Sequence, residues 1–292
     1  MAQLIKLEDY VSRYEWNPFR YPSQFIRLKK ENWKKLFHLW TDGQYPLTDK
    51  NSEIWSFFSK QNDQHEKQIF PNTKEELKQY YLDQLFYFQL KWATSTVTEL
   101  SFTKKEYHFD RLLKYFLQRF PDIYLIMYYP IFNVKNVPID GDILVISPIG
   151  IEIIHMLEVA GNANIRVENG RTWTIHDGDR ILTNKISPLI SLKRTEQIVK
   201  GVLNIYNIDF PIQKTVLSRS NHMIFSSEPF GTRFIGKSEY EQWFKQKRQL
   251  RSSLKRVQLK TIEALLKQCF TTSIKRPEWE EDASVFSFDK ES

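Results

Sequence analysis

Acidic side chains and a histidine lie close together in the segment PIDGDILVISPIGIEIIHMLEVAG, residues 138–161. Asp140 and Asp142 open one apolar, β-rich run, and His155 and Glu158 follow in the next. If the two runs pair as neighbouring strands, Asp142 and Glu158 bring two hard oxygen ligands together. Such a pair can hold Mg²⁺, which polarises a phosphate and lowers the pKa of a bound water. The segment therefore predicts a metal-dependent site that cleaves phosphodiesters, with Asp142 and Glu158 as metal ligands and catalytic residues.

A mixed α/β order of elements surrounds this segment and would position its side chains. The pair of strands is expected to be antiparallel and to turn tightly at Ser147 to Gly150, because SPIG supplies a proline and a glycine. Helices are expected over 103–120 and 187–208, a strand over 122–132, a hairpin over 164–175, and short strands near 212–218 and 222–226.

The stretch IDGDILVISPIGI, residues 139–151, resembles the nuclease-related domain (NERD) family in its order of Asp, apolar strand, Ser-Pro turn and Gly. Glu106, Trp173 and the Pro-Leu pair at 188–189 are further family-like features, so the resemblance covers about residues 101–210. It implies a restriction-endonuclease-like fold, a mixed sheet flanked by helices. It also implies Mg²⁺ as cofactor, with Asp142 as the metal-binding residue of an Asp…Glu-x-Lys signature.

The chain departs from that signature after Gly150. Strict spacing places His155 and Leu157 at the family's Glu and Lys positions, whereas a one-residue bulge would place Glu158 and Ala160 there. Neither register supplies the lysine, which in this fold would orient or help deprotonate the attacking water. The resemblance therefore implies weak or absent cleavage.

Two nearby groups are candidates to replace the missing lysine. Lys193 lies on the expected helix after the sheet strands, and His155 is a candidate general base. The plain alternatives are that Lys193 is a solvated helix residue, that His155 packs within its strand, and that Asp142 serves a turn.

Positive charge is concentrated near the C-terminus. Residues 245–276 hold ten lysines and arginines against one acid, Glu263, while the whole chain carries a formal net charge of +7. A long basic helix is expected over 237–276, and its charge suits the phosphate backbone of DNA or RNA. A solvated helix face is the plain alternative. The residues expected to contact nucleic acid are Lys247, Arg248, Arg251, Lys255 and Arg256.

The N-terminal part differs from the rest in being aromatic-rich and helical. Helical spacing over 27–40 and a capping box formed by Thr73 and Glu76 predict two helices, and the aromatic residues fit packing. This region is expected to be structural or to bind a protein partner. The expected parts are a helical N-terminal region (1–100), a nuclease-related core (101–236), a basic helix (237–276) and an acidic tail (277–292).

The composition narrows the classes of protein that remain. With 41% hydrophobic and 15% aromatic residues the chain should be globular, and no apolar run approaches the roughly 18 residues needed to span a bilayer. No membrane partner and a cytoplasmic location are therefore expected. Cys269 is the single cysteine, which excludes an internal disulfide. The sequence favours a nucleic-acid-binding, nuclease-related protein; the alternative is a catalytically inactive scaffold or protein-interaction module on the same fold.

Overall fold

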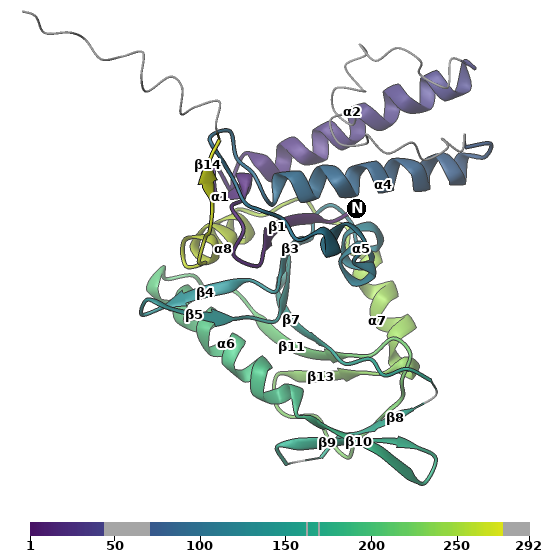
Figure 1. The fold of residues 1–292 in the computed structure, drawn as a ribbon, viewed down its shortest axis with the longest axis vertical. Coiled ribbons are helices and arrows are strands. Elements are labelled where there is room, and N and C mark those ends of the chain that lie inside the picture. The colour runs from purple at the N-terminus through teal and green to yellow at the C-terminus, as the bar shows by residue number, and fades with distance from the viewer. Residues whose placement is uncertain (44–70, 162, 169, 277–292) are drawn as a thin grey trace, which may run out of the picture.

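A six-stranded mixed β-sheet forms the centre of the protein (Figure 1). This computed structural model describes residues 1–43, 71–161, 163–168 and 170–276. The strands lie in the order β1-β3-β6-β7-β11-β13, in which β3, β6 and β7 pair antiparallel and β7, β11 and β13 pair parallel. Their bounds are β1 Gln3–Leu7, β3 Leu125–Tyr128, β6 Ile143–Ser147, β7 Gly150–Met156, β11 Ile212–Leu217 and β13 Thr232–Ile235.

The hairpin expected around residues 147–150 is present between β6 and β7. The two strands pair without a register shift from Ile143 opposite Ile154 to Ser147 opposite Gly150. The Ser147 hydroxyl donates to the Gly150 carbonyl oxygen (3.0 Å), which closes the turn. Gly150 is needed there because a Cβ atom would lie 2.8 Å from the carbonyl oxygen of Pro211. The prediction of two neighbouring antiparallel strands is confirmed.

Helices cover both faces of this sheet, so the predicted class of a mixed sheet flanked by helices is confirmed. His155 and Glu152, three residues apart on β7, point to opposite faces. His155 contacts Ser191 of α6, whereas Glu152 contacts Trp243 of α7.

The α-helices are α1 Arg13–Trp16, α2 Tyr21–Thr41, α4 Lys74–Trp92, α5 Arg111–Arg119, α6 Pro188–Ile205, α7 Lys237–Gln249 and α8 Arg256–Lys267.

Capping residues decide where several helices begin. Thr73 and Glu76 form the predicted capping box at the start of α4. The prediction of a single helix over 103–120 is wrong, because this segment forms a 3₁₀ turn at Lys105–His108 followed by α5. Asp110 causes the break: its carboxylate accepts hydrogen bonds from the backbone amides of the second and third residues of α5, at 2.8 and 3.0 Å.

The long basic helix expected over 237–276 is also corrected by the structure. It forms two helices, α7 and α8, joined by residues 250–255. Leu250 leaves α7 with an extended backbone, and Leu250 and Leu254 both pack against the hydrophobic core. Two serines between these leucines favour non-helical backbone, so the chain bends where two apolar anchors hold it.

The N-terminal region contributes to the central sheet. β1 pairs parallel with β3, so the expected boundary at residue 100 does not separate the first residues from the core. Near the C-terminus, β14 (Ile274–Lys275) pairs with β2 (Glu99–Leu100), which joins the end of the described chain to the same region. α2 and α4 extend side by side beyond the sheet (Figure 1).

A second, four-stranded sheet lies beyond β13, at the bottom of Figure 1. Its strand order is β10-β9-β8-β12, and the hairpin expected over 164–175 corresponds to β8 and β9. Trp173 is fully buried and packs edge-on against Phe234 of β13, 5.5 Å between ring centroids, which anchors this sheet. The bounds are β8 Asn164–Arg166, β9 Thr172–Asp177, β10 Arg180–Ile186 and β12 Met223–Ile224, with a separate hairpin of β4 Ile131–Val134 and β5 Val137–Asp140.

Among the helices of the described residues, none combines the length and the apolar character that crossing a membrane requires.

Candidate functional site

Asp142 and His155 form the centre of the candidate site. Asp142 immediately precedes β6, and the pairing of Ile143 with Ile154 places it across from His155 on β7. His155 Nδ1 lies 2.8 Å from Asp142 Oδ1. Of the two registers expected from the sequence, the structure has the one without a bulge. Leu157, the residue that this register aligns with the lysine of the expected signature, is buried.

Helix α6 supplies two hydroxyls to the same carboxylate. Thr195 Oγ1 donates to Asp142 Oδ2 (2.9 Å), and Ser191 Oγ lies 3.3 Å from Oδ1. The two residues are one helical turn apart, so they reach the carboxylate from one face of α6. Asp142 is only 4% exposed. The hydrogen bonds from the two hydroxyls and the contact with His155 together offset the cost of burying its charge. A cation at Asp142 would have to displace some of these partners.

The grouping of Ser191, His155 and Asp142 is not a hydrolase triad. In a triad the carboxylate orients one ring nitrogen while the serine hydroxyl meets the other. Here Ser191 Oγ, at 3.0 Å, and Asp142 both meet Nδ1 of His155. The imidazole therefore does not activate Ser191 as a nucleophile. Nε2 makes no hydrogen bond with the described residues, and the side chain is 31% exposed, so Nε2 is accessible to water or to a ligand.

Glu158 lies apart from Asp142 and is held by Arg219. Its two carboxylate oxygens accept from Nε and Nη2 of Arg219, at 2.6 and 2.7 Å, and the backbone amide of Arg219 adds a third hydrogen bond. The Arg219 guanidinium also lies over the ring of Tyr115, 4.6 Å from its centroid. Strand β7 ends at Met156, so Glu158 lies beyond the pairing that brings His155 to Asp142. The expected convergence of Glu158 and Asp142 is therefore not seen.

No alternative cluster takes the place of the expected metal ligands. Within the described ranges, no group of three or more histidine, cysteine, aspartate or glutamate side chains is arranged to hold a metal ion. Asp142 and His155 alone contribute one oxygen-donor and one nitrogen-donor side chain, fewer ligands than Mg²⁺ takes from carboxylates and waters in its usual sites. The site geometry thus favours a hydrogen-bonded cluster over a two-carboxylate metal site.

The ion pair of Glu158 leads to a pH prediction. Hydrogen bonds from Arg219 lower the pKa of Glu158 below its ordinary value of 4.5. The pair therefore stabilises the fold above about pH 4.5, and this stabilisation is lost as the pH falls through the lowered folded-state pKa. Glu158→Gln should reduce the free energy of unfolding by roughly 0.5–1 kcal/mol at pH 7, and the deficit should shrink on acidification.

Urea denaturation of both proteins between pH 7 and pH 3 measures this deficit. The control is Glu241→Gln, the same substitution at an exposed position, and it should change the stability little at either pH. A deficit for Glu158→Gln that stays constant over the whole range would show that the ion pair does not hold this carboxylate.

Lys193 does not reach the candidate site. It is exposed and lies two residues after Ser191, which turns it about 200° around α6 from the face that meets Asp142. The neighbouring Arg194 donates to the backbone carbonyl oxygen of Asp140 at 3.1 Å. Neither residue stands where the missing lysine would be, and of the two predicted substitutes the structure places His155 alone beside Asp142.

The five basic residues expected to contact nucleic acid have different surroundings. Lys247 Nζ lies 2.5 Å from Glu152 Oε2, so this cation is already paired. Arg248 lies over the ring of Phe244, 5.7 Å from its centroid. Arg251, Lys255 and Arg256 are exposed and form no ion pair with the described residues. We refer to Arg248, Arg251, Lys255 and Arg256 as the α7–α8 basic surface.

Three polar residues with central roles were not predicted. Glu152 is buried and accepts hydrogen bonds from Thr215 Oγ1 (2.6 Å) and Trp243 Nε1 (3.0 Å). Ser191 and Thr195 are the other two. Their spacing of four on an amphipathic helix that follows the strand of His155 is a signal that the sequence did contain.

Comparison with known proteins gives little further evidence. No protein-family profile matches the chain, and no solved structure matches it. One curated protein, an RNA 2′,3′-cyclic phosphodiesterase of Geobacillus stearothermophilus, is 48% identical over 40 residues. That segment covers 14% of this chain and 13% of the other protein. So short a match shows no family.

Proposed function

We propose that this chain is a nuclease-related protein similar to the NERD family, with a restriction-endonuclease-like core, and that it binds nucleic acid without cutting it efficiently. The observation that carries the proposal is the place of Asp142, at the mouth of a central strand that pairs with β7 and is covered by α6. The order α5-β3-β6-β7-α6-β11, in which successive strands are neighbours, supports the core assignment.

The composition of the site supports binding without efficient cleavage. His155 and Leu157 stand where the family signature has Glu and Lys, so one metal ligand and the group that activates water are both replaced. Removing a preorganised charged group of this kind from a catalytic site lowers the rate by about 10²–10³-fold. Both carboxylate oxygens of Asp142 are already hydrogen-bonded to His155, Ser191 and Thr195, so the polarisation of a phosphate by a bound Mg²⁺ would be weakened as well.

The α7–α8 basic surface supports nucleic acid as the ligand. Its three arginines and one lysine form no ion pair with an acid among the described residues, so they are free to meet phosphates. The acid-poor stretch from 245 to 276 would attract a polyanion of any sequence. RNA belongs among the candidate ligands beside DNA, because the Geobacillus protein that shares the 40-residue segment is named as an RNA 2′,3′-cyclic phosphodiesterase.

Fluorescence anisotropy with labelled single-stranded and duplex DNA and RNA tests the proposal. We expect at least one ligand to bind, with an affinity that falls linearly on a log–log plot against KCl concentration, because counterions are released from the phosphates. The second candidate is an inactive scaffold that binds a protein partner. It is favoured by the projecting α2–α4 pair (Figure 1) and by Trp16, the last residue of α1, which is 60% exposed. It predicts no binding to any of the four ligands at low salt.

A further inference from the structure

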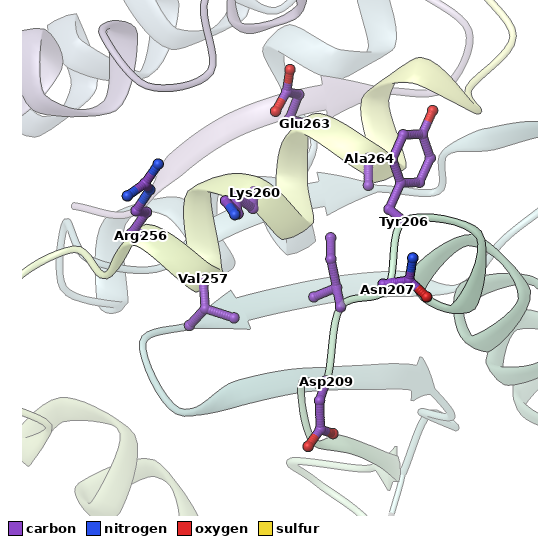
Figure 2. A pocket seen from close by; sticks show the side chains of 9 residues that line it. Tyr206, Asn207, Asp209, Arg256, Val257, Lys260, Glu263 and Ala264 are labelled. Atoms are coloured by element: carbon purple, nitrogen blue, oxygen red, sulfur yellow. The ribbon is translucent and has the colours of Figure 1, made fainter.

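A cavity of about 550 Å³ lies between the turn after α6 and helix α8 (Figure 2). Residues 206–209 form one wall and α8 forms the other. Tyr206 is fifteen residues beyond Ser191 along α6, which at 1.5 Å per residue is about 20 Å from the Asp142 cluster. The cavity is therefore separate from the candidate site, and its volume is in the usual range for a small-molecule site.

Two unpaired cations stand at the mouth of this cavity. Arg256 and Lys260 lie one helical turn apart on α8, so both side chains project from the same face. Both are exposed, and neither forms an ion pair with any residue that the structure describes. An arginine fork beside a lysine ammonium is suited to a phosphate group, with charge-assisted hydrogen bonds from each.

The rest of the lining is not that of a site for a simple anion. Val257, Ile208 and Ala264 provide an apolar floor, and the ring of Tyr206 stands beside Ala264. Two carboxylates, Asp209 and Glu263, also line the cavity. Glu263 is paired with Lys267 (2.9 Å), whose ammonium lies over the Tyr206 ring, 6.0 Å from its centroid. Asp209 has no hydrogen-bond partner among the described residues and would repel a ligand made of negative charge alone. Such a lining suits a ligand with a phosphate at one end and a planar ring and donor groups at the other.

We propose that this cavity binds a nucleoside monophosphate group. The phosphate meets Arg256 and Lys260, the base lies on Tyr206 and the apolar floor, and a hydroxyl or amino group of the nucleoside donates to Asp209. A free mononucleotide and the terminal nucleotide of a strand share this chemistry. Arg256 belongs both to this cavity and to the α7–α8 basic surface, whereas the other cavity residues lie outside that surface. The inference goes beyond the proposed function because it concerns a single nucleotide held in a cavity and does not require a polymer.

Isothermal titration of the full chain with 5′-AMP, 5′-GMP, 5′-CMP and 5′-UMP tests the inference. At least one nucleotide should bind saturably with one site per chain, and the unphosphorylated nucleoside should bind at least about tenfold more weakly. Arg256→Gln together with Lys260→Gln should weaken the nucleotide by at least about tenfold. Lys30→Gln with Lys34→Gln, two exposed cations one helical turn apart on α2, is the matched control and should leave binding unchanged.

A second variant keeps the test valid if the double substitution disturbs the helix. Tyr206→Ala, on the opposite wall, should weaken the nucleotide several-fold, whereas Tyr206→Phe, which keeps the ring, should retain most of the affinity. A 5′-phosphorylated tetranucleotide that binds more tightly than the mononucleotide assigns the cavity to strand ends, and the reverse assigns it to free nucleotides. Absence of saturable binding by both, or equal losses in the cavity and control variants, would overturn the inference. Neither of these results would decide whether the chain binds a polymer, because the anisotropy assay measures polymer binding separately.

Discussion

Changing Arg248, Arg251 and Lys255 together to glutamate should weaken the binding of nucleic acid by roughly 100-fold or more at low salt. Three cations of the α7–α8 basic surface are replaced by acids, so attractive contacts with phosphates become repulsive. The slope of log affinity against log salt should also become shallower by about three, because each lost phosphate contact removes about one unit. Fluorescence anisotropy across a KCl series measures both quantities.

A control of equal charge separates this surface from the overall charge of the protein. Arg27, Lys30 and Lys34 are exposed on one helix, α2, and changing them to glutamate alters the net charge by the same amount. That variant should keep most of the affinity and nearly the whole slope. Equal losses of affinity in the two triple variants would show that the α7–α8 basic surface is only a solvated helix face.

Glu152→Ala should cost about 3–5 kcal/mol of folding free energy, the largest effect we expect of any single substitution. The side chain is buried between the sheet and α7, where it accepts from Thr215 and Trp243 and pairs with Lys247. Removing it leaves the Trp243 indole N–H and the Thr215 hydroxyl without an acceptor and leaves the Lys247 ammonium unpaired. Chemical denaturation of the two proteins measures the difference.

Matched substitutions show whether the charge or the hydrogen bonds matter. Glu152→Gln retains an acceptor for Trp243 and should cost less than the alanine substitution, whereas Glu241→Ala, exposed on α7, should change stability by no more than about 0.5 kcal/mol. Adding Lys247→Met to Glu152→Ala should recover part of the loss, because the unpaired cation is removed. A loss below about 1 kcal/mol for Glu152→Ala would show that water or another group replaces the carboxylate.

Local signals in the sequence predicted the elements nearest the site. The β6–β7 hairpin followed from two apolar runs joined by SPIG, and α4 followed from its capping box. Both depend on residues within a few positions of one another. The fold class followed from the order of these elements, and the place of Asp142 at the mouth of β6 followed from the same hairpin.

Contacts between distant parts of the chain could not be predicted in this way. β1 pairs with β3 across more than a hundred residues of sequence, and no periodicity in QLIKL identifies that partner. Glu152 has the sequence pattern of a surface strand residue, yet its partner Trp243 lies 91 residues later. Which residue lies opposite Asp142 depends on whether β7 contains a bulge. The sequence allowed either His155 or Glu158 there, and the observed pairing shows that it is His155.

A single gel assay distinguishes binding without cleavage from nuclease activity, because it reports binding and cleavage on the same labelled nucleic acid. Wild-type protein is incubated with the tightest-binding ligand in Mg²⁺ or Mn²⁺, and half of each sample is run native and half denatured. We expect a retarded band in the native lanes and full-length ligand in the denatured lanes. Cleavage products that disappear with Asp142→Ala would contradict the account by showing a working metal site, and the absence of any retarded band would contradict it by showing that the chain does not bind nucleic acid.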